Sequence, residues 1–291
     1  MAKKIIAVTG ATGHVGKVIV QKLREAGHEV RKISRKSGVP DDDLIALTNA
    51  FYGADAAFLM LPPDFKTLNL RKRCGEIGSK LASAVKAAGV KRVVFLSSLN
   101  AHLSEHTGPI LGLHDTEERL NALGIPELTH LRPAYFMENH LGGAEYIAHH
   151  GNYGTALRPD IAIPMIATID IGTKAAELLV EEPYREPRVR ELLGPRDYTM
   201  TQAAGILGKA IDMPDLKYVQ LSYDQARQNM LAMGLTAGYA DAMVELSRFM
   251  NEAMIQGTEP RAAVNTTPTT LEHFAQVVFR SAYEQAATVM R

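Results

Sequence analysis

Three glycines near the start of the chain, Gly10, Gly13 and Gly16, have the spacing of a phosphate-binding turn. The turn follows an apolar segment, residues 5–9, and precedes an amphipathic segment, residues 17–26. In such a strand, turn and helix, the first glycine permits a tight bend, the second lets backbone approach a pyrophosphate, and the third packs the helix against the strand. The N–H groups that begin the helix then face the phosphates. The pattern predicts a dinucleotide site that also includes Thr12, His14 and Val15.

The residues that end the second apolar segment bear on the choice of cofactor. An Asp or Glu about twenty residues beyond the glycines would hold the ribose hydroxyls of NAD. This chain instead has Ser34, Arg35 and Lys36. Arg35 is suited to bind a phosphate bidentately, and Ser34 adds a hydroxyl group. We therefore predict NADP(H) as the preferred cofactor and NAD(H) as the second. The alternative is that Arg35 is a surface residue without a ligand.

Strand-like and helical segments alternate along the first half of the chain, which is typical of βαβ units. We predict an α/β fold, a Rossmann-type doubly wound parallel sheet with helices on both faces and a smaller α/β C-terminal substrate lobe. The predicted strands are Ile5–Thr9, Glu29–Ile33, Ala56–Leu61, Arg92–Ser97 and Leu128–Leu131, with a long helix over Phe65–Ala88. Because ligands bind at the carboxyl ends of parallel strands, one edge should carry Gly10, Arg35, Pro62, Ser97 and Pro133.

The pattern changes after Pro133, where loops rich in Gly and Pro alternate with short helices. We therefore predict two domains: an NAD(P)-binding Rossmann domain over residues 1–133, and a substrate lobe over residues 134–291 with segments that return to the Rossmann sheet. Capping boxes predict three helix starts in the lobe, at Thr199–Gln202, Ser222–Gln225 and Thr269–Glu272.

Composition excludes several classes of protein. Lys plus Arg and Asp plus Glu number 32 each among 291 residues, and this balance argues against direct nucleic-acid binding. The sequence has neither a long apolar run nor the pattern of a signal peptide, so we expect no membrane association and a cytoplasmic location. The single cysteine, Cys74, has no predicted catalytic role. Two pairs with helical metal-ligand spacing, His102 with His106 and Glu145 with His149, each lack a third ligand, so we predict no metal.

Several motifs together resemble the NmrA-like family of atypical short-chain dehydrogenases/reductases. They are Gly10–Gly16, Phe58–Pro63, Phe95–Ser98, His114-x-x-x-Glu118, Leu131–Asn139 and Thr267–Phe274. The family contains NAD(P)H-dependent quinone oxidoreductases, triphenylmethane and azo dye reductases, and redox-sensing regulators that are not enzymes. The resemblance alone therefore leaves catalysis and sensing open.

The resemblance also implies where the cofactor and substrate bind. Its implied cofactor residues are Leu61, Pro62 and Pro63, then Ser97 and Ser98 beside the nicotinamide, and Pro133, Ala134, Tyr135 and Phe136 on the other side. The expected substrate residues are Leu99, Asn100, His102, Tyr135, Met137 and Asn139. His114 occupies the position from which family members orient the nicotinamide ribose.

Two departures from the extended relatives bear on the reaction. Those relatives carry a catalytic Tyr where this chain has Ile110 and a Lys where it has His114, and no Tyr-x-x-x-Lys occurs in the sequence. Ordinary carbonyl reduction thus loses its acid, whereas a quinone or dye with delocalised charge collects its proton from water or a modest acid. His114 is the first candidate acid and His102 the second, since histidine titrates near neutrality. The alternative is that His114 only binds the ribose or caps the helix through Glu118.

The second departure is the short segment 35–54, which has no room for the usual helix, strand and Gly-Asp turn that cover the adenine. Either the third strand is missing or residues were omitted from the chain. In the first case the adenine pocket is open or is completed by Asp41–Asp43.

The leading functional hypothesis is an NADPH-preferring oxidoreductase that transfers hydride directly to a small planar substrate such as a quinone or dye. The first alternative is a non-catalytic NADP(H)-binding redox sensor that acts through a regulatory protein partner. A weaker alternative is a reductase of imines or specialised metabolites. A homodimer is the other assembly considered.

Overall fold

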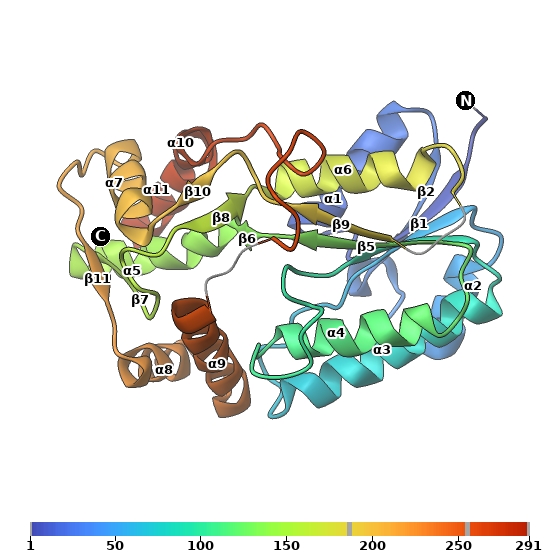
Figure 1. The fold of residues 1–291 in the computed structure, drawn as a ribbon, viewed down its shortest axis with the longest axis horizontal. Coiled ribbons are helices and arrows are strands. Elements are labelled where there is room, and N and C mark those ends of the chain that lie inside the picture. The colour runs from blue at the N-terminus through green and yellow to red at the C-terminus, as the bar shows by residue number, and fades with distance from the viewer. Residues whose placement is uncertain (1, 185–187, 254–256, 290–291) are drawn as a thin grey trace.

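The computed structural model describes residues 2–184, 188–253 and 257–289, and a twisted parallel sheet runs through one half of the molecule (Figure 1). Within these residues the main sheet has six strands, all paired in parallel. Their spatial order is β2 (Glu29–Ile33), β1 (Ile5–Thr9), β3 (Ala56–Leu59), β4 (Arg92–Leu96), β5 (Glu127–Pro133) and β9 (Arg188–Leu192). Parallel pairing brings all their carboxyl ends to one edge, which confirms the predicted Rossmann-type sheet.

Helices cover both faces of this sheet. On one face α1 (His14–Glu25) packs against α6 (Thr168–Val180), and on the other α3 (Leu70–Ala87) packs against α2 (Leu44–Phe51) and α4 (Ile110–Asn121) (Figure 1). Buried strand residues such as Val8 and Phe58 pack toward the first face, whereas Ala57 and Leu59 join a separate core with α2 and α3. This alternation along β3 is the period expected of a strand between two layers.

The sheet ends at β2, where segment 35–54 contributes no further strand. A short 3-10 helix, Arg35–Ser37, follows Ser34 in a capping box with Ser37, and Asp43 caps α2 by accepting from the N–H of Ala46. Leu47 of α2 is fully buried against the sheet. The missing third strand is therefore a feature of this fold, in which α2 follows directly from the loop after β2.

The chain leaves the main sheet at Ala134 and builds the second half of the molecule. There β10 (Asp197–Tyr198), β8 (Ile163–Ile166) and β6 (Tyr135–Phe136) form one small sheet, and β11 (Tyr218–Gln220) pairs with β7 (Tyr153–Thr155). The helices of this lobe are α5 (Gly143–His150), α7 (Met200–Ala210), α8 (Tyr223–Ala232), α9 (Ala237–Ala253), α10 (Leu271–Phe274) and α11 (Arg280–Val289). Helix α6 and strand β9 return from this lobe to the Rossmann sheet (Figure 1).

Some predicted boundaries are wrong. The long helix begins at Leu70 rather than Phe65, because Asn69 caps it by accepting from the N–H of Lys72. Strands β3 and β4 end earlier than predicted, at Leu59 and Leu96, and β5 is longer, Glu127–Pro133.

The capping boxes at Thr199 and Ser222 are confirmed, but the third is not. Thr270 caps α10, because Thr269 instead donates to the buried carboxylate of Asp170. None of the helices described combines the length and apolar character that crossing a bilayer requires.

Candidate functional site

The turn between β1 and α1 has room only for glycine at two positions. Gly10 has a φ of +62°, and a Cβ there would lie 2.4 Å from the sulfur of Met60. A Cβ on Gly16 would lie 2.2 Å from the carbonyl oxygen of Gly10, so helix α1 packs directly on the turn. Gly13 precedes the helix without a side-chain cap, which leaves backbone N–H groups to face an anion. The geometry fits the tight bend predicted at Gly10 and the helix packing predicted at Gly16, and the pyrophosphate contact at Gly13 stays a prediction.

A cavity of about 520 Å³ opens at this turn, along the carboxyl edge of β1, β2 and β3. We call it the first cavity. It brings together predicted cofactor residues from three separate segments: Gly10, Thr12, Gly13, Ser34, Arg35, Lys36, Pro62 and Pro63. Its lining also includes residues that sequence reasoning did not assign to the site: Thr9, Ile33, Val39, Leu47, Met60 and Leu81, with Asp41 from the segment proposed to complete the adenine pocket.

Thr9 is a lining residue that also sets the shape of the first cavity. Its hydroxyl donates to the carbonyl of Phe58 at 3.1 Å and accepts from the N–H of Met60 at 2.9 Å. The end of β3 is thereby held beside the glycine turn. Thr9 is the last residue of an apolar strand, and this position at the ligand-binding edge is the signal that could have identified it.

The cations that follow β2 are available to a ligand. Arg35 and Lys36 line the first cavity with exposed side chains. Neither side chain forms an ion pair or hydrogen bond with any other residue that the structure describes. Two unpaired cations beside a glycine-rich turn fit a cofactor that carries a phosphate on its ribose.

At the end of β4, two buried polar groups lack a partner among the described residues. Ser97 and Asn100 are 4% and 7% exposed, and the Ser97 Oγ and the Asn100 Nδ2 make no hydrogen bond. An unpartnered buried polar group costs free energy, so these atoms fit the polar groups of a bound molecule. The N–H of Leu99 donates to the carbonyl of Pro133 at 3.0 Å, which joins this turn to the end of β5.

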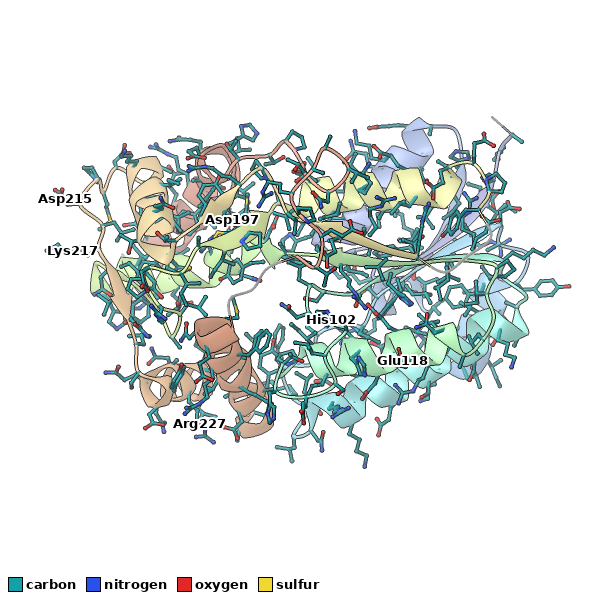
Figure 2. The ribbon with its side chains drawn as sticks, viewed as in Figure 1. His102, Glu118, Asp197, Asp215, Lys217 and Arg227 are labelled. Carbon is teal, nitrogen blue, oxygen red and sulfur yellow. The ribbon has the colours of Figure 1, made fainter. Side chains whose placement is uncertain are left out.

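The two predicted catalytic histidines line a different cavity. His114 and His102 lie in a second cavity of about 430 Å³ beside α4, and Figure 2 shows His102 in the loop before α4 and Glu118 on that helix. The His114 Nδ1 lies 2.9 Å from the carbonyl oxygen of Ala101, so Nδ1 carries the proton, and Nε2 has no hydrogen-bond partner in the described part of the chain. His102 is exposed. The structure thus places both histidines outside the first cavity.

Charged and titratable side chains hold the second cavity together. Arg132 and Glu117, both almost fully buried, form a two-pronged ion pair in which Nε donates to Oε1 at 2.9 Å. The Nε2 of His130 lies 2.8 Å from the amide oxygen of Asn121, and burial lowers the pKa of His130. The complete lining is Ala101, His102, His114, Glu117, Glu118, Asn121, His130, Arg132, Arg188 and Val189.

The other predicted residues are not part of the lining of the first cavity. Pro133, Ala134 and Met137 are buried, Ser98, Leu61, Tyr135 and Phe136 are half-buried, and His14 and Asn139 are exposed. Val15 and Gly16 are buried under the turn. Burial raises the pKa of Tyr135, whose ring centroid lies 5.5 Å from that of His140. Met137 is fully enclosed in the core, so a role in substrate contact would require it to move.

Known proteins are similar to this chain in sequence and in fold. Quinone oxidoreductase 2 of Escherichia coli is 30% identical over 256 residues, which cover 83% of this chain and 86% of the relative. The NAD(P)H azoreductase of Xenophilus azovorans is 27% identical over 256 residues, with the same two coverages of 83% and 86%. The fold matches the crystal structure of the E. coli NADPH-dependent quinone oxidoreductase complexed with NADPH, with a TM-score of 0.67, 24% identity and coverage of 98% of this chain and 100% of that one. A model of the NmrA-like family matches residues 2–275, and the chain therefore belongs to the NmrA-like family.

Proposed function

We propose that this protein is an NADPH-preferring oxidoreductase that transfers hydride directly from the nicotinamide to a planar electrophile such as a quinone or a dye. The observation that carries the proposal is the first cavity, where a glycine turn and two unpaired cations share one space. The relatives named for azo and quinone reduction support the reaction class. Because these relatives are named as enzymes, a non-catalytic sensor is the less favoured reading.

The chain's own residues divide the binding of NADPH between them. The turn at Gly10 and the N–H groups that begin α1 receive the pyrophosphate. Arg35 and Lys36, with Ser34, receive the 2′-phosphate. The unpartnered Ser97 Oγ and Asn100 Nδ2 lie beyond the carboxyl end of β4, the strand next to β3, where we place the nicotinamide end of the extended dinucleotide. Bound NADPH supplies the hydride.

The residues available for proton transfer fit an acceptor that needs little acid catalysis. Helix α4 carries apolar Ile110 where a tyrosine acid would stand, and it carries His114 one turn later. The Ala101 carbonyl fixes the tautomer of His114, which leaves Nε2 to hold the proton in the imidazolium form. We propose His114 as the donor to the reduced acceptor, with His102 as the second candidate.

The first experiment follows NADPH consumption by the purified protein with a panel of quinones and dyes. NADH is run in parallel, and cofactor binding is measured in the same sample by nicotinamide fluorescence. Saturable turnover that favours NADPH is the expected result. Tight binding of NADPH without consumption on any acceptor would contradict the proposal and favour the sensor.

The His114→Ala variant then tests the proton donor. We expect kcat to fall by about tenfold, below the usual range for general acids because water replaces the donor for a delocalised acceptor. The matched control is His149→Ala on α5, an exposed histidine that lines neither cavity, and it should keep kcat within about twofold. A loss of kcat in His102→Ala with none in His114→Ala would assign the proton to His102 instead. Unchanged kcat in His114→Ala would remove His114 from the mechanism.

The cytoplasmic location and the homodimer stay predictions.

A further inference from the structure

Two loops contribute to the lining of the first cavity. One is the segment 38–43 that replaces the third strand, and it contributes Val39 and Asp41 to the lining. The other follows β3 and contributes Pro62 and Pro63. Neither loop belongs to a strand or helix, so side chains from elsewhere must fix their positions.

Arg73, in the first turn of α3, joins both loops. Its Nη2 lies 3.7 Å from the carboxylate of Asp41 and 3.7 Å from that of Asp42, and its Nε lies 3.3 Å from that of Asp64. Its Nη1 lies 3.8 Å from Glu76 on the same helix. From the next turns of α3, the Lys80 ammonium donates to the backbone carbonyl of Asp42 at 2.7 Å. One helix therefore anchors both loops through a single guanidinium.

The charges of this cluster matter to the ligand of the first cavity. Four carboxylates surround the Arg73 guanidinium, and that of Asp41 belongs to a residue that shares the cavity lining with Arg35 and Lys36. This cluster of Arg73 and its four carboxylates is partly exposed, since 25% of the Arg73 side chain is accessible. Salt therefore screens its electric field beyond the Debye length of about 10 Å, and charges within that distance feel it. Without the guanidinium, these carboxylates would repel a phosphate bound at Arg35.

We propose that Arg73 is a positioning residue for cofactor selectivity: it neutralises the acidic loops so that the cavity accepts a 2′-phosphate. The inference rests on the proposed function, because it assumes that the first cavity binds NADPH. It assigns the preference for NADPH to a residue that does not line the cavity, in addition to the cations that do. NADH, which has no 2′-phosphate, should depend on Arg73 much less.

The test measures the Kd of NADPH and of NADH for the Arg73→Met variant, which keeps an unbranched side chain and removes the charge. We expect the NADPH Kd to rise about tenfold and the NADH Kd to change less than about twofold. Raising the salt concentration should shrink this difference, since the cluster is partly exposed. The Arg73→Lys variant should keep most of the NADPH affinity. Adding Asp41→Asn to Arg73→Met should restore most of it.

Arg71→Met is the matched control, because Arg71 lies on the same helix but pairs with Asp115 of α4, away from the first cavity. It should leave the ratio of the two Kd values unchanged. An equal rise for NADPH and NADH in Arg73→Met, or no change in either, would overturn the inference. The wild-type protein is measured first: if it fails to bind NADPH, the proposed function fails, whereas normal wild-type binding with an unchanged ratio in Arg73→Met overturns only the role of Arg73.

Discussion

The two cavities beside the main sheet use their charged residues in opposite ways. In the first cavity, Arg35 and Lys36 form no ion pair with the residues described, Asp41 pairs with Arg73, and the rest of the lining is backbone turns and uncharged side chains. In the second cavity, Arg132 forms an ion pair with Glu117, and Arg188 forms one with Glu181. The first therefore has positive charge to offer a ligand, whereas the second uses its charge to join α4 to β5 and β9 to the end of α6. Cations available to a ligand and ion pairs that support the fold are thus separated along the same sheet, and the proposed proton donors His114 and His102 lie beside the ion pairs.

The largest effect should come from breaking the buried ion pair of the second cavity. Arg132→Met leaves the Glu117 carboxylate buried, with 3% of its side chain exposed, and without its partner. We expect the free energy of unfolding to fall by about 3–5 kcal/mol in a denaturant titration. Adding Glu117→Leu should recover most of this loss.

Arg158→Met provides the control for that measurement. It breaks the exposed pair with Asp160, whose side chain is 62% accessible, and should cost less than about 1 kcal/mol. Similar losses in Arg132→Met and Arg158→Met would show that the second cavity does not depend on its internal ion pair.

The next prediction tests whether the backbone shape of the glycine turn determines NADPH binding in the first cavity. Gly16→Ala places a methyl group 2.2 Å from the Gly10 carbonyl oxygen, so the turn must shift. We expect the Kd of NADPH to rise about 100-fold, which corresponds to about 2.7 kcal/mol. The control is Gly205→Ala in α7, where a Cβ meets no atom within 4 Å. Circular dichroism should show both variants folded, and equal NADPH binding in the two would contradict the proposed role of the turn.

The contrast between the cavities also explains what the sequence could predict. The first cavity forms at a local motif and at strand ends, so Gly10, Gly13 and Arg35 were identified from order and spacing alone. Leu81 was missed because it lines the cavity from the middle of α3, and its apolar type is equally suited to the core. Such a residue faces the cavity only because of its angular position around a helix, and local sequence spacing carries no sign of that.

The second cavity was missed as a unit because residues far apart in the chain form it. His114 and His102 were singled out for catalysis, yet their neighbours His130 and Arg188 come from β5 and β9. Strand β9 itself was not predicted, since three of its five residues, Arg188, Arg190 and Glu191, are charged and the apolar alternation of a strand is broken at this edge of the sheet. The predicted helix start at Phe65 failed for a related reason: the Phe65 carbonyl accepts from the N–H of Thr236, just before α9.

A third prediction sharpens the assignment of the unpaired cations. Arg35→Asp reverses the charge at the 2′-phosphate position, and we expect the NADPH Kd to rise about 30-fold, or about 2 kcal/mol, with little change for NADH. Lys32→Asp makes the same change of charge on an exposed β2 residue outside the cavity lining. It should alter the ratio of the two Kd values much less. Equal losses for both cofactors in Arg35→Asp would remove Arg35 as the selector.

The smallest effect concerns the pH dependence of the second cavity. Burial lowers the pKa of His130. The nearby charge of Glu117 raises this pKa and that of Arg132 lowers it, and burial has the largest effect. The folded state therefore disfavours the added proton. The unfolded chain takes up that proton below its pKa of about 6.5, so this histidine makes stability fall as the pH decreases. Between pH 7.5 and 5.5 its contribution is at most about 1.4 kcal/mol. His130→Phe should therefore lose less stability over this range than the wild type.

The control for this last measurement is His106→Asn, because 80% of the His106 side chain is exposed and its φ of +62° is one that asparagine tolerates. Chemical denaturation of the three proteins at both pH values separates the two histidines. A wild-type pH dependence that survives unchanged in His130→Phe would mean that His130 gains its proton as easily in the folded protein as in the unfolded chain. The second cavity would then hold enough water to solvate an imidazolium at His130. At this residue, the second cavity would no longer differ from the first in how it treats a charge.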